Sequence, residues 1–175
     1  MSYIKILLFI FILKTNILAN ELAKLKSFEA SFTQTITNPS GNKVFYKGLI
    51  HIKEPNRIKW EYTTPIEKFV YIKKHTVTIL EPELEQAIIT KLENEINILS
   101  LLNNAKKISQ TKYISNFNNV NYTLTMNNNK LQDISYKDEI ENDVIITFTN
   151  VQQNHKIDSK IFKFFIPLEF DIIKK

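Results

Sequence analysis

The three histidines are the residues of this chain best suited to metal binding or to general acid–base chemistry. They are His51, His75 and His155, and none has the H-x-H, H-x-x-x-H or H-E-x-x-H spacing that would build a metal site. The chain contains no cysteine, which excludes thiolate ligands, a cysteine nucleophile and disulfides. We therefore expect neither a metal nor a cofactor.

Acidic pairs and glycine-rich loops give no better evidence of catalysis. The pairs Glu81 with Glu83 and Asp138 with Glu139 lie in turn-like sequence, where carboxylates are usually solvated. Only 2 glycines occur in 175 residues, and no phosphate-binding loop, dinucleotide turn or G-x-S-x-G elbow is present. The sequence predicts a binding protein rather than an enzyme.

The run from Pro55 to Tyr62 offers an apolar surface on one side of a predicted strand. Side chains alternate between the two faces of a strand. One face would carry Ile58, Trp60 and Tyr62, and the other Arg57, Lys59 and Glu61. A single aromatic residue of this kind is more often core than ligand surface.

The elements that must position this surface follow from hydrophobic periodicity. Alternation predicts strands at 28–37, 43–53, 57–62, 68–73, 77–80, 122–126, 130–137, 143–150 and 161–165. A short helix is predicted at 21–26. A longer helix is predicted from Leu92 to Lys107, where Leu92, Ile96, Leu99 and Leu102 recur at helical spacing. Asparagine-rich runs around 116–121 and 127–129 predict turns.

These elements describe one domain of mainly β structure. At 175 residues and 43% hydrophobic, the chain is long enough for a single core. We expect a strongly curved antiparallel sheet, an unclosed β-barrel, with helices capping its concave apolar face. The net charge of +5 comes from scattered lysines, without the basic and aromatic interleaving of a nucleic-acid binder.

Residues 1–19 have the pattern of a secretory signal peptide. Lys5 precedes an apolar run from Ile6 to Leu13, and Ala19 ends a plausible cleavage site. The run is shorter than the roughly 20 residues of a membrane span. We expect cleavage, which leaves residues 20–175 as the mature domain in the periplasm.

The order of several short motifs resembles the LolA family of periplasmic outer-membrane lipoprotein carriers. The central motif comprises Pro55, Arg57 or Lys59 with Trp60, Tyr62, Pro65 and Gln86. Earlier in the chain, Ser27, Phe28, Phe32, Thr33 and Gln34 carry the resemblance. The closing motif comprises Phe162, Phe164, Pro167, Asp171, Ile172 and Ile173. Glu54 departs from the family, which places at this position an arginine that ties a lid closed.

The resemblance implies a monomeric carrier that binds the acyl chains of lipoproteins. It would receive them from a lipoprotein-releasing ABC transporter of the inner membrane and pass them to an outer-membrane receptor, if one exists. The implied acyl-chain cavity is lined by Phe28, Phe32, Ile58, Trp60 and Tyr71. The implied lid carries Leu92, Ile96, Leu99 and Leu102. The alternative is a periplasmic sensor or interaction domain that uses the same curved sheet to bind a regulatory protein.

Overall fold

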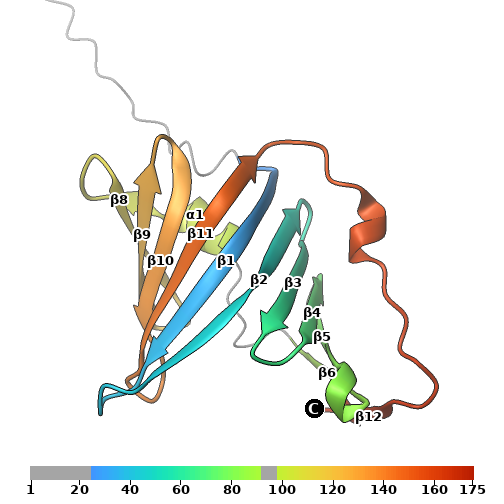
Figure 1. Cartoon of the computed structure of the whole chain (residues 1–175). Coiled ribbons are helices and arrows are strands. Elements are labelled where there is room, and N and C mark those ends of the chain that lie inside the picture. Colours follow the sequence, from blue (N-terminus) through green and yellow to red (C-terminus); the bar gives the residue numbers. More distant parts are fainter. Residues whose placement is uncertain (1–24, 92–97) are drawn as a thin grey trace, which may run out of the picture.

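The alternating segments of the sequence form one large sheet. The fold is seen in a computed structural model that describes residues 25–91 and 98–175 (Figure 1). The first strands follow one another along the chain as β1 (Ser27–Thr37), β2 (Lys43–Lys53), β3 (Arg57–Thr64), β4 (Lys68–Lys73), β5 (Thr76–Glu81) and β6 (Gln86–Lys91). Each pairs antiparallel with the next.

Five of the later strands extend the same sheet on the other side of β1. They are β7 (Lys106–Lys107), β8 (Lys112–Phe117), β9 (Val120–Asn127), β10 (Lys130–Lys137) and β11 (Asp143–Gln153). The last strand, β12 (Asp171–Lys174), instead joins the opposite edge beside β6. The spatial order is β12-β6-β5-β4-β3-β2-β1-β11-β10-β9-β8-β7. The edges, β12 and β7, stand at opposite ends of this order, so the curved sheet is not closed into a barrel. The predicted fold class is confirmed, although β12 pairs parallel, not antiparallel, with β6.

Asparagine builds the tight turns between the later strands. Asn118 and Asn119 join β8 to β9 with φ of 49° and 62°, and Asn128 and Asn129 join β9 to β10 with φ of 48° and 59°. Two successive positive φ values define the turn type whose twist suits a two-residue hairpin. The predicted turns are confirmed.

One side of the sheet carries the core, together with α1 (Ile98–Asn104). Register puts Phe28 beside Ile52, and Ile52 beside Ile58, so they lie in one row across β1, β2 and β3. We call this side the inner face. In β1 to β5 its buried residues are Phe28, Ala30, Phe32, Gly48, Ile50, Ile52, Ile58, Trp60, Val70, Ile72 and Val77.

Two predicted elements need correction. The predicted helix from Leu92 to Lys107 ends early, since α1 stops at Asn104 and Lys106 and Lys107 pair with Ile114 and Tyr113 in the sheet. Its first six residues, 92–97, lie outside the described residues. The helix predicted at 21–26 is also largely outside them, and Leu25 and Lys26 lead directly into β1 without helical structure.

The strand predicted at 161–165 is wrong. A 3-10 helix, η3 (Ser159–Phe162), occupies its first half, and the Asp158 carboxylate accepts a hydrogen bond from the Lys160 backbone N–H at 2.9 Å. This cap favours a helical turn over an extended chain. A second 3-10 helix, η2 (Pro82–Leu84), joins β5 to β6.

Candidate functional site

Four of the five predicted cavity residues meet on the inner face. Phe28, Phe32, Ile58 and Trp60 are between 0% and 6% exposed. The sequence alternation places them there, because Phe28 and Phe32 share one phase of β1 while Ile58 and Trp60 share one phase of β3. The structure therefore brings together an apolar surface assembled from adjacent strands.

Tyr71, the fifth predicted residue, lies on the opposite side of the sheet. Its neighbours in register are Lys59 and Thr78, whereas Val70 and Ile72 occupy the inner face. Its ring stacks on Phe164 with centroids 4.4 Å apart. Burial raises the pKa of the Tyr71 phenol, and the Lys59 ammonium acts against that shift. The structure therefore does not bring Tyr71 together with the other four predicted residues.

Four aromatic rings interlock on the inner face, and we call them the aromatic cluster: Phe32, Tyr46, Trp60 and Tyr62. The Phe32 ring meets the Trp60 and Tyr62 rings edge to face, at centroid distances of 5.0 and 5.2 Å. Tyr46 meets Tyr62 edge to face at 6.0 Å. This geometry is the favoured one for aromatic pairs. Sequence analysis identified Phe32 and Trp60 but not Tyr46.

Gly48 makes the close packing around the cluster possible. It lies between Phe32 and Tyr62 in the sheet, next to an irregularity in the pairing of β2 with β3. A Cβ atom at this position would stand 1.8 Å from the backbone oxygen of Glu61 and 3.0 Å from Cε1 of Phe32. Only glycine fits without moving the backbone.

The character of the inner face changes from dry to polar across the aromatic cluster. Phe32 and Trp60 are buried, whereas Tyr46 and Tyr62 are half-buried. The Tyr62 hydroxyl donates a long hydrogen bond to the side-chain carbonyl of Gln34, at 3.5 Å. The ammonium of Lys68 stands 4.6 Å from the centroid of the Tyr62 ring. The cluster thus stands where the inner face of β2 and β3 becomes more exposed and gains polar neighbours.

Helix α1 packs its apolar side into the same core as the inner face. Ile98, Leu101 and Leu102 are fully buried there. Of the predicted lid residues, Leu102 is therefore in contact with the core, while Leu92, Ile96 and the side chain of Leu99 lie outside the described part of the chain. Ile98 and Leu101 were not among the predicted lid residues, although their spacing with Leu102 is helical and could have identified them.

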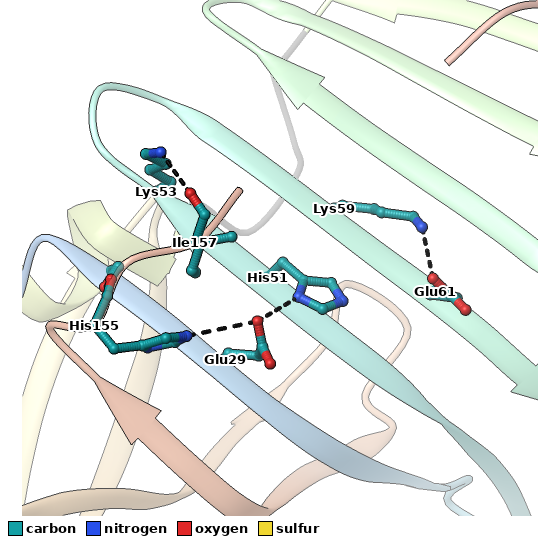
Figure 2. A network of polar contacts seen from close by, with 8 residues as sticks. Glu29, His51, Lys53, Lys59, Glu61, His155 and Ile157 are labelled. Carbon is teal, nitrogen blue, oxygen red and sulfur yellow. Dashed lines mark hydrogen bonds and ion pairs between the residues drawn. The ribbon is translucent and has the colours of Figure 1, made fainter. Parts of the chain in front are cut away.

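The C-terminal segment, residues 154–175, crosses the outer side of the sheet before it joins the edge as β12. Lys53 Nζ donates to the backbone oxygen of Ile157 at 2.6 Å (Figure 2), and Arg57 donates to Oγ of Ser159 at 3.3 Å. The Arg57 guanidinium also lies 5.9 Å from the centroid of Phe162. Arg57 therefore helps to hold this segment against the outer side of β3.

A polar network fastens the start of the C-terminal segment. Glu29 Oε2 lies 2.9 Å from Nδ1 of His51 and 3.7 Å from Nε2 of His155 (Figure 2). Lys59 pairs with Glu61 at 2.6 Å on the same side of the sheet. Within residues 25–91 and 98–175, no group of three or more His, Cys, Asp or Glu side chains is arranged to hold a metal ion. We interpret the network as structural.

No helix in the described part of the chain has the length and apolar character needed to cross a membrane.

Comparison with known sequences gives one consistent result. The family model described as outer membrane lipoprotein carrier protein LolA matches residues 23–121. The chain is 40% identical over 148 residues to the outer-membrane lipoprotein carrier protein of Campylobacter jejuni, covering 85% of this chain and 86% of the relative. It is 32% identical over 150 residues to the protein of the same name from Wolinella succinogenes, covering 85% and 87%.

Two crystal structures share the fold. One is an uncharacterized conserved protein from Thermus thermophilus, with a TM-score of 0.54 and 8% identity, covering 89% of this chain and 94% of that one. The other is a LolA superfamily protein from Nitrosomonas europaea, with a TM-score of 0.54 and 10% identity, covering 83% and 94%. At such low identity the likeness concerns the fold alone.

Proposed function

Because this chain belongs to the LolA family of outer-membrane lipoprotein carrier proteins, we propose that the inner face of its sheet binds the acyl chains of lipoproteins. Its function is that of a lipoprotein carrier. The family is named for carrying a cargo rather than for a reaction. We further propose that the protein binds and releases that cargo without chemical change.

The observation that carries the proposal is the apolar surface shared by β1 to β5 and α1. Phe28, Ile52 and Ile58 form a fully buried row across three strands, and the side chains of α1 pack into the same core. An acyl chain laid along this row would meet aliphatic and aromatic groups. Such a surface has no fixed polar partner, which suits a ligand that must later be released.

The size of the hydrophobic effect explains why a carrier is needed. Each methylene removed from water contributes about 0.8 kcal/mol, so a chain of about 15 methylenes represents roughly 12 kcal/mol. A bare chain would therefore remain in its membrane. A protein that buries the chain lowers this cost and allows transfer through water.

We propose that α1 is the lid over this surface. It is a helix of seven residues, and its described contacts with the sheet are mainly with β8, near one edge. Short elements at a sheet edge belong to the less stable part of a fold. Opening of α1 would uncover the inner face while the long strands β1, β2 and β11 keep their pairing.

The cellular setting follows from the same proposal. We propose that residues 1–19 are removed as a signal peptide and that the carrier acts as a monomer in the periplasm. Its partners would be acylated lipoproteins, a lipoprotein-releasing ABC transporter of the inner membrane and, if one exists, an outer-membrane receptor.

Native mass spectrometry of the protein purified from the periplasm tests the function. We expect a fraction of the protein to carry diacylated or triacylated material, and we expect an acylated peptide to displace an apolar fluorescent probe. The same peptide without its acyl chains is the control and should displace nothing. Equal displacement by both peptides would refute acyl binding and favour recognition of the polypeptide.

A further inference from the structure

In β2 and β3, the burial of the inner face drops sharply over two residues. Ile58 and Trp60, on the dry side, are 1% and 6% exposed. Two residues further along β3, Tyr62 is half-buried, and Val44, further along the inner face of β2, is 46% exposed. The aromatic cluster stands at this change.

The rings of the cluster have little freedom to move aside. Phe32 meets both Trp60 and Tyr62 edge to face, and Tyr46 braces Tyr62 from the next strand. Beneath Phe32, the backbone of Gly48 approaches Glu61 too closely to admit a Cβ atom. Rings held by one another and by backbone are poorly able to make room for a ligand.

Beyond the Tyr62 ring, polar groups stand on the inner face. The side-chain carbonyl of Gln34 accepts from the Tyr62 hydroxyl, and Lys68 places its ammonium over the Tyr62 ring. A hydrocarbon that passed the Tyr62 ring along β3 would lie next to an amide and a cation. It would gain less there than on the dry side, because polar groups that lose water without a hydrogen bond are destabilised. The apolar residues further along this face, Ile36 and Val44, are only partly covered or exposed.

We propose that the aromatic cluster is a stop that limits the length of acyl chain which the inner face accommodates, with Tyr62 as its outermost determinant. The proposal rests on the proposed acyl binding. It adds that the chain lies along the strands with its methyl end toward the cluster. Chains short of the stop gain affinity with every methylene, and longer chains do not.

The test uses one peptide acylated with saturated chains of increasing length. In the wild-type protein, we expect affinity to rise on the order of fourfold per added methylene and then to level off at a limiting length. Tyr62→Ala should move the limit to longer chains and raise the affinity for a chain two methylenes past it by about sixteenfold. Tyr62→Trp should move the limit to shorter chains.

Tyr71→Ala is the matched control, since it removes a half-buried tyrosine ring from the other side of the same sheet. It should leave the limit unchanged. A thermal melt of each variant verifies folding, and Tyr46→Ala replaces Tyr62→Ala if the latter does not fold. An unmoved limit in folded variants, or no limit in the wild-type protein, would overturn the stop. Failure of the wild-type protein to bind any chain would instead overturn the proposed function.

Discussion

The two faces of β3 perform different tasks with alternate residues of one strand. Its inner residues, Ile58 and Trp60, belong to the buried apolar surface. Its outer residues include Arg57, which holds the C-terminal segment through Ser159, and Lys59, which pairs with Glu61. Because successive side chains of a strand point to opposite faces, the proposed cargo surface and the contacts that hold the C-terminal segment lie on opposite sides of β3. Each set of residues can therefore be altered without the other.

The largest effect is expected from a charge on the inner face. Ile58 is 1% exposed, so Ile58→Glu would bury a carboxylate among aliphatic groups, which raises the pKa of the new side chain and costs several kcal/mol. We expect chemical denaturation to show a loss of at least about 3 kcal/mol. Lys47→Glu, an exposed change on the outer side of β2, should stay within about 0.5 kcal/mol. Equal losses would show that the two faces do not differ.

The next effect comes from the close approach at Gly48. Gly48→Ala places a Cβ atom where the Glu61 carbonyl stands, and we expect a loss of about 3 kcal/mol because β2 and β3 must separate. Gly41→Ala is the control. Its site is open, and only its φ of 86° opposes a side chain, so about 1 kcal/mol is expected. A Gly48→Ala variant as stable as Gly41→Ala would contradict the packing described for the aromatic cluster.

A smaller effect is expected on the outer side. Phe164→Ala removes the ring stacked on Tyr71, an interaction of the kind worth about 1 kcal/mol. We expect hydrogen exchange in β12 to become faster, because the chain leading to it loses an anchor. Acyl-peptide binding should be unchanged. Reduced binding in this variant would show that the two faces are coupled and would contradict their proposed independence.

The smallest effect lies in the turn between β10 and β11. Burial tends to raise the pKa of Asp138, but hydrogen bonds from Asn142 and Ile140 outweigh it and lower the pKa overall. A carboxyl with a lower pKa in the folded state stabilises the protein above the unfolded value of about 3.9 and loses this contribution as pH falls through the folded value. Asp138→Ala should therefore cost less than about 1 kcal/mol at neutral pH and nothing in strong acid. A cost independent of pH would point to the turn geometry instead.

Local alternation predicted the strands well where one face is apolar and the other polar. The strands at 43–53, 68–73 and 130–137 were predicted with the bounds that the structure shows. It was harder to predict which side chains of β4 face the core, because Phe69 and Tyr71 are as apolar as Val70 and Ile72. Only the pairing of Tyr71 with Lys59 decides which set faces the core, and register is not a local property.

Contacts between distant segments could not be predicted from local pattern. Lys53 and Ile157 are 104 residues apart, and nothing in either neighbourhood indicates their hydrogen bond. The same holds for β12, whose four exposed residues join β6 in parallel. For the predicted lid helix, local pattern was only partly sufficient. Leu102 packs into the core as its helical spacing suggested, whereas Lys106 and Lys107 are not helical and pair with β8.

Photochemical labelling tests the central claim most directly. A peptide whose acyl chain carries a diazirine at its terminal carbon would be bound, irradiated and mapped by mass spectrometry. We predict labels on the inner face, concentrated at the aromatic cluster in the segments that contain Phe32 and Tyr62. Labels on the outer side, at Phe45, Ile145 or the C-terminal segment, would contradict the account.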